Sequence, residues 1–302
     1  MKTTSLINHH VVTGTLCAGA ALFLAGHAQA QNLFVSDYFA GQIYEYTPGG
    51  VPSTFATGSL GSSGLAFNSS GDLFAGATST GAIYEYTSGG VPSTFATGLN
   101  GPYALAFNSA GNLFEADDSG GNVYEFTSGG TRSTFASGLN QPWGLAFNTA
   151  GNLFVSDYES GDIYKYTGGT QSVFASGLNG PSGLTFNSAG DLFVSDTLSG
   201  DILEYTPGGG QSTFATGLSF PEGLAFNSAG DLFVADSHSG NVYEYTPGGV
   251  QSTFASGLDY PFELAFAPVP EPSTLALLAA GASAMALRLS RKNNSATKNS
   301  IA

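Results

Sequence analysis

Few residues of this chain carry side chains suited to chemistry on a ligand. After residue 30 there is one histidine, His238, and no cysteine. A histidine acts as a general base when a second group orients it, and a glutamate acts as a general acid when its surroundings raise its pKa. The candidate catalytic residues are therefore His238, Glu222 and Glu263, and the sequence gives none of them a recognisable partner.

The same two glutamates are the candidate metal ligands. Ca²⁺ prefers oxygen ligands, and Glu222 and Glu263, together with Asp118 or Asp259, could supply them. The sequence has no P-loop, no dinucleotide fingerprint, and neither a G-x-S-x-G nor an H-E-x-x-H motif. Ca²⁺ is thus the only cofactor that the sequence suggests.

The chain that must position these residues is a six-fold repeat. The tripeptide L-[AT]-F recurs every 39 or 40 residues, beginning at Leu65, Leu105, Leu145, Leu184, Leu224 and Leu264. Three further apolar segments keep the same period, namely L-F-V-S-D, I-Y-E-Y and S-T-F-A-[ST]-G with their variants. A fixed period of this length indicates a repeat architecture.

Each repeat is predicted to form four short β-strands. The segments are about four to six residues long, rich in Phe, Tyr, Ile and Val, and bounded by turns such as N-S-A-G and T-P-G-G. Four antiparallel strands per 40 residues are typical of a β-propeller blade. The chain enters at a second strand (Leu33) and leaves after a first strand (Leu264). We therefore expect an all-β, six-bladed propeller whose two ends share one blade, which removes exposed sheet edges.

The repeats differ mainly on one predicted face of the ring. Successive strands alternate in direction, so the loops before the first strand and after the second strand open on this side, which we call the variable face. The opposite side carries the near-identical N-S-A-G and T-P-G-G turns, and we call it the uniform face. Aromatic rings beside carboxylates suit binding of sugars or peptides, but large side chains could also serve only to close the channel mouth. The predicted binding residues are Tyr38, Tyr103, Asp118, Trp143, Tyr158, Glu222, His238 and Phe262.

An aspartate recurs at the end of the second strand, at Asp37, Asp117, Asp157, Asp196 and Asp236. Its repetition favours a role in capping turns over a role in chemistry. The second repeat has Ala77 there, which marks either an opening in the variable face or a weaker turn.

Residues 31–267 carry 21 acidic and two basic side chains, a formal charge of −19. Such a domain repels phosphate groups, so nucleic acid is excluded as a partner.

The stretch P-x-G-L-A-F-N-S-A-G-D-L-F-V-A-D-S-x-S-G-N-V-Y-E-Y, from Pro221 to Tyr245, resembles the NHL repeat. It is also similar to blades of SMP-30/gluconolactonase-like and streptogramin-lyase-like propellers. The first resemblance implies a divalent cation in the central channel, but the ligand set of those enzymes is not reproduced in register. The second implies a histidine base, for which His238 is the only candidate.

The two ends of the chain carry predicted targeting segments. Residues 1–30 have the features of a signal peptide, with Lys2, an apolar stretch and the cleavage site Ala28-Gln29-Ala30. Removal of this segment leaves no cysteine, so disulfides are excluded. The expected segments are a signal peptide (1–30), a propeller (31–267) and a C-terminal tail (268–302).

The tail combines Pro270-Glu271-Pro272, an apolar run and a basic end. A helix over residues 273–289 would span roughly 25 Å, slightly short of a bilayer core of roughly 30 Å. The order resembles the PEP-CTERM sorting signal of Gram-negative bacteria. The resemblance implies processing by an exosortase (a membrane transpeptidase), transient anchoring in the inner membrane by the tail helix, and association with extracellular polysaccharide.

Two classes of function stay open. In the first, the protein is an exported, non-catalytic propeller at the cell surface that binds a glycan or a protein through its variable face. In the second, it is a metal-dependent hydrolase, lactonase or lyase with a cation in the central channel. The sequence favours the first because no asymmetric polar cluster fits the enzyme families.

Overall fold

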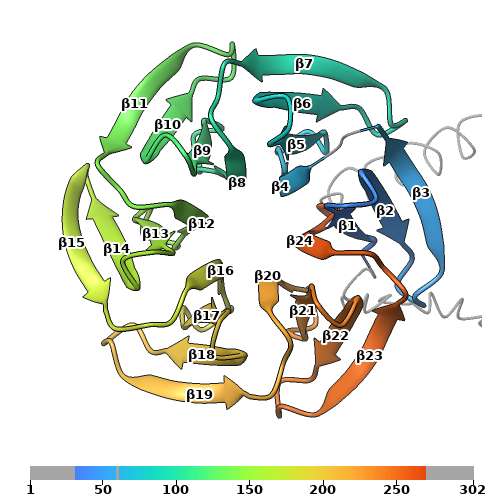
Figure 1. Cartoon of the computed structure of the whole chain (residues 1–302), viewed down its shortest axis with the longest axis vertical. Coiled ribbons are helices and arrows are strands. Elements are labelled where there is room, and N and C mark those ends of the chain that lie inside the picture. Colours follow the sequence, from blue (N-terminus) through green and yellow to red (C-terminus); the bar gives the residue numbers. More distant parts are fainter. Residues whose placement is uncertain (1–30, 59–60, 270–302) are drawn as a thin grey trace, which may run out of the picture.

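The computed structural model describes residues 31–58 and 61–269. These residues form 24 strands in six four-stranded antiparallel sheets, and none of them is helical. The sheets stand around a central axis as the blades of a propeller (Figure 1). The predicted all-β, six-bladed fold is confirmed.

Every blade runs from an inner strand at the axis to an outer strand at the rim. Blade 1 contains β24 (Pro261–Phe266), β1 (Leu33–Asp37), β2 (Gln42–Tyr46) and β3 (Pro52–Thr57). Blade 2 contains β4 (Ser62–Phe67), β5 (Leu73–Ala77), β6 (Ala82–Tyr86) and β7 (Pro92–Thr97). Blade 3 contains β8 (Pro102–Phe107), β9 (Leu113–Asp117), β10 (Asn122–Phe126) and β11 (Arg132–Ser137). Blade 4 contains β12 (Pro142–Phe147), β13 (Leu153–Asp157), β14 (Asp162–Thr167) and β15 (Thr170–Ala175). Blade 5 contains β16 (Pro181–Phe186), β17 (Leu192–Asp196), β18 (Asp201–Tyr205) and β19 (Gln211–Ala215). Blade 6 contains β20 (Pro221–Phe226), β21 (Leu232–Asp236), β22 (Asn241–Tyr245) and β23 (Gln251–Ser256).

The turns of the uniform face explain why the strands start and stop where they do. In blade 3 the side-chain oxygen of Asn108 accepts hydrogen bonds from the backbone N–H groups of Ala110 (3.0 Å) and Asn112 (2.9 Å). The following Gly111 has φ +81°, a conformation that glycine adopts without a steric penalty. The same asparagine turn recurs in blades 2, 4, 5 and 6.

The hydrophobic core lies between neighbouring blades. Along β13, Leu153 and Val155 pack against Phe114 and Ala116 of blade 3, whereas Phe154 faces blade 5. This alternation follows the two-residue period of a strand, so each second strand contributes to two interfaces. Burying one such aliphatic side chain stabilises the fold by about 1.5–3 kcal/mol.

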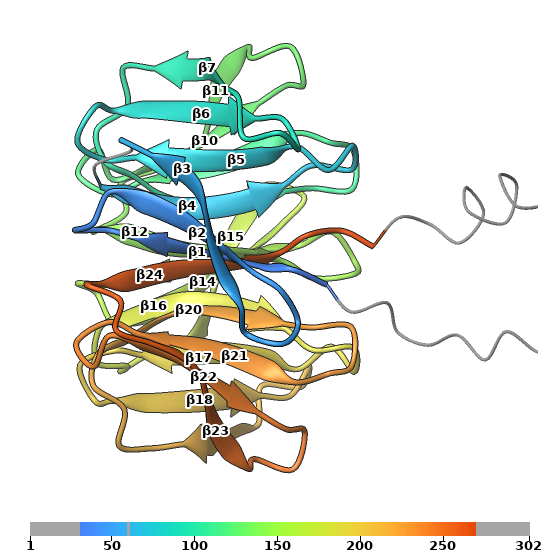
Figure 2. The ribbon, with the colours of Figure 1, turned by 90° about the vertical axis from the view of Figure 1, so that its right-hand side faces the viewer.

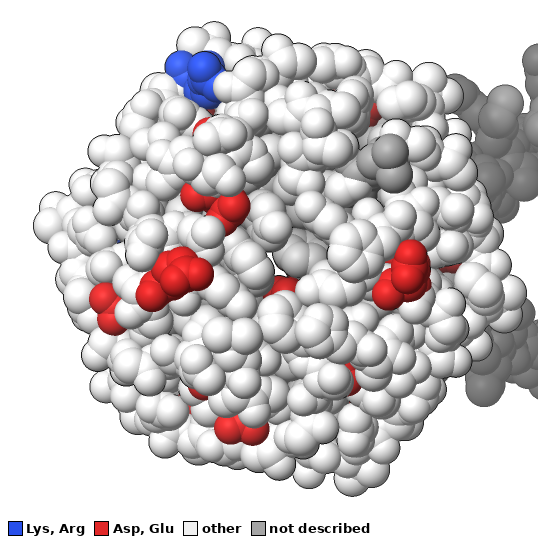
Figure 3. Space-filling model, viewed as in Figure 1, with Lys and Arg blue, Asp and Glu red and all other residues white. Residues whose placement is uncertain are grey.

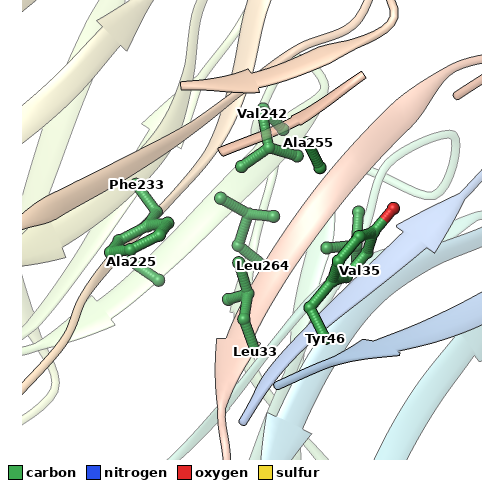
Figure 4. Packing of buried hydrophobic residues seen from close by; sticks show 9 residues of the cluster. Leu33, Val35, Tyr46, Ala225, Phe233, Val242, Ala255 and Leu264 are labelled. Carbon is green, nitrogen blue, oxygen red and sulfur yellow. The ribbon is translucent and has the colours of Figure 1, made fainter. Parts of the chain in front are cut away.

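Both chain ends meet in blade 1. β24 pairs antiparallel with β1, placing Phe266 opposite Leu33. Leu33 and Val35 from the start of the ring and Leu264 from its end pack together against blade 6, where Phe233 is buried (Figure 4). Closure is therefore achieved by side-chain packing as well as by strand pairing.

The first and last described residues lie on the uniform face. β1 begins there and β24 ends there, so the chain enters and leaves on the side opposite the variable face (Figure 2). Over the part of the chain that the structure describes, no helix is long and apolar enough to cross a membrane. The predicted signal peptide and most of the predicted C-terminal tail lie outside the described residues.

Candidate functional site

The variable face is held together by the recurrent aspartates. The Asp117 carboxylate accepts a hydrogen bond from the backbone N–H of Asn100 at 2.8 Å, and Asp157 accepts one from Asn140 at 2.8 Å. The same bond forms in blades 1, 5 and 6. In blades 3 to 6 the backbone donor is thus 17 residues earlier in the chain, in the loop before the first strand. Each aspartate links the loop before the first strand to the loop after the second strand, while Ala77 gives blade 2 no such carboxylate.

Aromatic side chains from three blades form one continuous cluster at the centre of this face. Tyr103 and Trp143 stack with centroids 5.1 Å apart, and Trp143 stacks on Tyr158 at 3.8 Å. Phe262 contacts the edge of Tyr103 at 5.5 Å and lies 5.8 Å from Tyr38. The structure therefore brings five of the eight predicted binding residues into a single cluster.

The Trp143 ring packs against its neighbours and is not free to stack on a ligand. Its two faces lie against Tyr103 and Tyr158, and its indole Nε1–H donates to Asp118 Oδ1 at 2.8 Å. Burial raises the pKa of Asp118, while this hydrogen bond opposes the rise. Trp143 thereby fixes the positions of Tyr103 and Asp118.

A depression of about 430 Å³ opens beside the cluster, over the loops of blade 2. Tyr38, Tyr103 and Asp118 line it from blades 1 and 3, together with Phe39. Blade 2 contributes only small groups, and the hydroxyl of Thr78 donates to the hydroxyl of Tyr38 at 3.1 Å. The depression lies over the blade in which Ala77 replaces the aspartate.

Phe39 was not among the predicted binding residues, yet 59% of its surface is exposed at the rim of the depression. It packs against Tyr260 at 4.8 Å, a second aromatic residue that the prediction omitted. Phe39 lies in the loop after the second strand of blade 1, and Tyr260 lies in the loop before its first strand. Variation between the repeats points to these two loops in the sequence. It does not distinguish Phe39 and Tyr260 from the other residues of the same loops.

Glu222 and Glu263 lie at neighbouring positions of blades 6 and 1, below the aromatic cluster. Glu222 is 2% exposed, and its Oε1 has no hydrogen-bond partner. Burial, and then the negative charge of Glu263, raise the pKa of Glu222 well above its ordinary value. Burial also raises the pKa of Glu263 to about 8. Burial thus favours the protonated form of both carboxyls. Acidic atoms are visible at the central hollow of this face (Figure 3).

His238 lies apart from these glutamates. Its exposed imidazole stacks on Phe220 with a centroid separation of 4.4 Å and contacts Tyr260 edge-on at 5.8 Å. Within the described residues, the His238 imidazole forms no side-chain hydrogen bond. Its neighbours are aromatic rings, and none of them orients it as a general base.

The predicted Ca²⁺ site is not matched by the geometry. Within residues 31–58 and 61–269, no three His, Cys, Asp or Glu side chains are grouped so that they could hold a metal ion. Glu222 and Glu263 are close enough for the charge of Glu263 to act on Glu222. In the described part of the chain, these two glutamates therefore lack a third His, Cys, Asp or Glu ligand.

A further glutamate lies inside the ring wall. Glu115 of β9 is fully buried, and neither carboxylate oxygen has a hydrogen-bond partner. The position is Val35, Val155, Val194 or Val234 in four other blades. Burial raises the pKa of Glu115 well above its usual value. The only hint in the sequence is this one glutamate in a column of apolar residues.

Fold and repeat together define a six-bladed β-propeller. A family model of the NHL repeat matches residues 218–242. A model of the PEP-CTERM protein-sorting motif matches residues 268–292, which include Pro270, Glu271 and Pro272. The second match implies export, sorting to the surface or membrane, and processing by an exosortase-type system. A search of curated proteins gave no significant match.

Solved structures share the ring at low sequence identity. A chain in a nidogen/laminin complex is 20% identical, with a TM-score of 0.73 over 79% of this chain and 98% of that chain. A proposed gluconolactonase is 20% identical, with a TM-score of 0.63 over 77% of this chain and 88% of that chain. Virginiamycin B lyase from Staphylococcus aureus is 15% identical, with a TM-score of 0.58 over 76% of this chain and 85% of that chain. At these identities the likeness establishes the fold alone.

Proposed function

We propose that this protein is an exported, non-catalytic propeller that binds a glycan or a protein through its variable face at the bacterial cell surface. In this proposal residues 1–30 are removed on export, and residues 268–302 form a membrane anchor until the sorting system acts. The binding site is the depression lined by Tyr38, Phe39, Tyr103 and Asp118. The protein works in association with extracellular polysaccharide.

The depression carries the proposal. It combines an exposed aromatic edge, two tyrosines and a carboxylate, which is the mixture of apolar and hydrogen-bonding groups that sugars and peptides require. The tyrosines are held in place by the stacked Trp143 and by Thr78. A preformed site loses little conformational freedom on binding.

The position of the chain ends supports the same function. The described chain leaves the ring on the uniform face, and only Ala267, Pro268 and Val269 separate β24 from Pro270. Three extended residues span about 10 Å. A ring attached through the sorting motif would therefore turn its variable face away from the attachment point.

Retention of the purified full chain on polysaccharide extracted from the surface of the producing cells tests the site. We expect Phe39→Ala and Tyr103→Ala each to weaken retention by about five- to thirtyfold, since each removes an aromatic contact worth roughly 1–2 kcal/mol. The matched control is Leu198→Ala, which removes another exposed apolar side chain of the same face, 52% exposed, in blade 5.

Unchanged retention in both aromatic variants would exclude the depression as a polysaccharide site. A surface protein that binds the wild type and the Leu198 variant, but neither aromatic variant, would identify the ligand as a protein.

A further inference from the structure

The uniform face carries two deep grooves that the proposed function does not use. One, of about 460 Å³, lies between blades 2 and 3, and the other, of about 500 Å³, lies between blades 5 and 6. Nearly every residue that lines the first has its counterpart 119 residues later in the second. The grooves are therefore two copies of one structure on opposite sides of the ring.

Each groove has an apolar floor with one carboxylate beside it. In the first groove Phe74 contacts the edges of Phe95 and Phe107, both at 5.1 Å. The half-buried Glu85 lines the same cavity, and its carboxylate has no hydrogen-bond partner among the described residues. In the second groove Phe193, Phe214, Phe226 and Glu204 occupy the same positions.

Each groove also offers a backbone donor. The asparagine turns that form the rims contain Ser69 in the first groove and Ser188 in the second. The N–H groups of these two serines donate to no acceptor within the described part of the chain. An apolar floor, a carboxylate acceptor and an N–H donor thus face the same space.

A third groove of the same kind, between blades 6 and 1, shows which group fits. It is lined by Phe233, Phe254, Phe266 and Glu244, and its volume is only about 160 Å³ because Gln31 also lines it. The Gln31 carboxamide accepts a hydrogen bond from the backbone N–H of Ser228 at 3.0 Å and donates one to the Ala267 carbonyl at 2.8 Å. Ser228 is the counterpart of Ser69 and Ser188, so an amide group occupies the position that the two open grooves leave free.

From this internal amide we infer that the two open grooves each bind an acetamido group, as carried by an N-acetylhexosamine unit of a glycan. The acetamido carbonyl would accept from Ser69 or Ser188, its N–H would donate to Glu85 or Glu204, and its methyl group would pack on the phenylalanine floor. The acidic rim disfavours anionic sugars, so the ligand is an uncharged glycan.

The equivalent position between blades 4 and 5 supplies a natural control. There Lys165 takes the place of the glutamate, and its Nζ lies 5.6 Å from the centroid of the Phe154 ring. The carboxylate is absent and the floor is covered by the lysine, so this position should not bind the acetamido group.

Calorimetric titration of the purified full chain with chitotetraose, and with cellotetraose as the matched sugar without acetamido groups, tests the inference. We expect two sites per chain for chitotetraose and binding of cellotetraose that is at least about tenfold weaker. Ser69→Pro with Ser188→Pro removes both N–H donors at the second position of each turn, where proline is well accepted. This double variant should weaken chitotetraose binding at least about tenfold, and Glu85→Gln with Glu204→Gln should weaken it as well.

Thr149→Pro makes the same turn substitution at the position that Lys165 covers, and it should leave the affinity unchanged. Tyr103→Ala on the opposite face should do the same, which separates this inference from the proposed function. Equal affinity for the two sugars, no binding of chitotetraose, or wild-type affinity in the folded Ser69/Ser188 variant would each overturn it.

Discussion

The two faces of the ring are built from the same repeat but are held in different ways. On the uniform face each asparagine turn closes on itself through hydrogen bonds two and four residues apart. On the variable face each aspartate instead joins two separate loops across 17 residues in blades 3 to 6. A self-contained turn fixes the identity of its residues, whereas a link between loops leaves the residues around it free to differ.

Backbone conformation shows the same contrast. In the described residues only Gln141 and Phe220 combine a side chain with a positive φ, and both lie in loops of the variable face. Left-handed residues other than glycine are strained by about 1 kcal/mol or more. The variable face tolerates this strain where it places aromatic side chains, and Phe220 stacks on His238.

The largest expected effect is a dependence of stability on pH that originates under the variable face. Glu263 has a pKa raised to about 8, and that of Glu222 is raised well above its ordinary value, against about 4.3 in an unfolded chain. Their contribution to folding is complete below about pH 4 and is lost as the pH rises through the folded-state values. The free energy of unfolding in urea should fall by a few kcal/mol between about pH 5 and pH 9.

Glu222→Gln with Glu263→Gln should flatten this profile, because glutamine has the shape of the protonated acid and does not ionise. The same substitution at Glu85 on the uniform face is the control and should leave the slope unchanged. A slope that is undiminished in the double variant would assign the pH dependence to other groups, such as Glu115.

The next largest effect is expected at Glu115, in the second strand of blade 3. Substitutions there test whether this residue contributes to the pH dependence of the free energy of unfolding. Glu115→Val restores the valine of four other blades and removes two carboxylate oxygens that lack partners. Because a buried group without a partner costs about 1–3 kcal/mol, the variant should be more stable by about that amount at neutral pH. Thermal and urea unfolding measure the gain.

Glu115→Gln separates the two causes. It keeps a buried polar group but cannot ionise, so it should remove the part of the pH dependence that Glu115 contributes without the full gain of the valine variant. A loss of stability in Glu115→Val would show that the carboxyl has a stabilising partner.

The smallest effect compares the two kinds of loop directly. Asp157→Ala removes the bond to Asn140 and should destabilise the fold by about 1–2 kcal/mol. Asn148→Ala opens a turn on the uniform face of the same blade, where water replaces the lost bonds, and should cost about 1 kcal/mol or less.

The single tryptophan distinguishes the variants further. Trp143 lies 3.8 Å from Tyr158, the neighbour of Asp157, so its fluorescence should change in Asp157→Ala and stay constant in Asn148→Ala. Equal fluorescence in both variants would mean that the aspartate does not control the variable face.

The fold could be predicted from the sequence because it depends on local and repeated signals. The period of L-[AT]-F set the number of blades, and the positions of Leu33 and Leu264 predicted their pairing in blade 1. Each repeated segment occurs six times, so a chance match in one copy does not change the predicted fold.

The site was less accessible from the sequence because it depends on contacts between blades. The repeat placed Tyr103, Trp143 and Tyr158 on one face but did not reveal that Trp143 lies between the other two rings. It also gave no sign that the Gln31 amide enters a groove on the opposite side, since Gln31 precedes the first repeat. Such contacts depend on how closed blades face one another, which no single repeat encodes.

The strand that completes blade 1 lies directly before the sorting motif in the chain. β24 ends at Phe266, and Pro270 follows three residues after it. Any chain whose synthesis stops before Pro261 lacks both the strand that completes blade 1 and the sorting motif. A ring truncated at that point would expose the edge of β1, which would make it prone to aggregate, and the same truncation would remove the sorting motif.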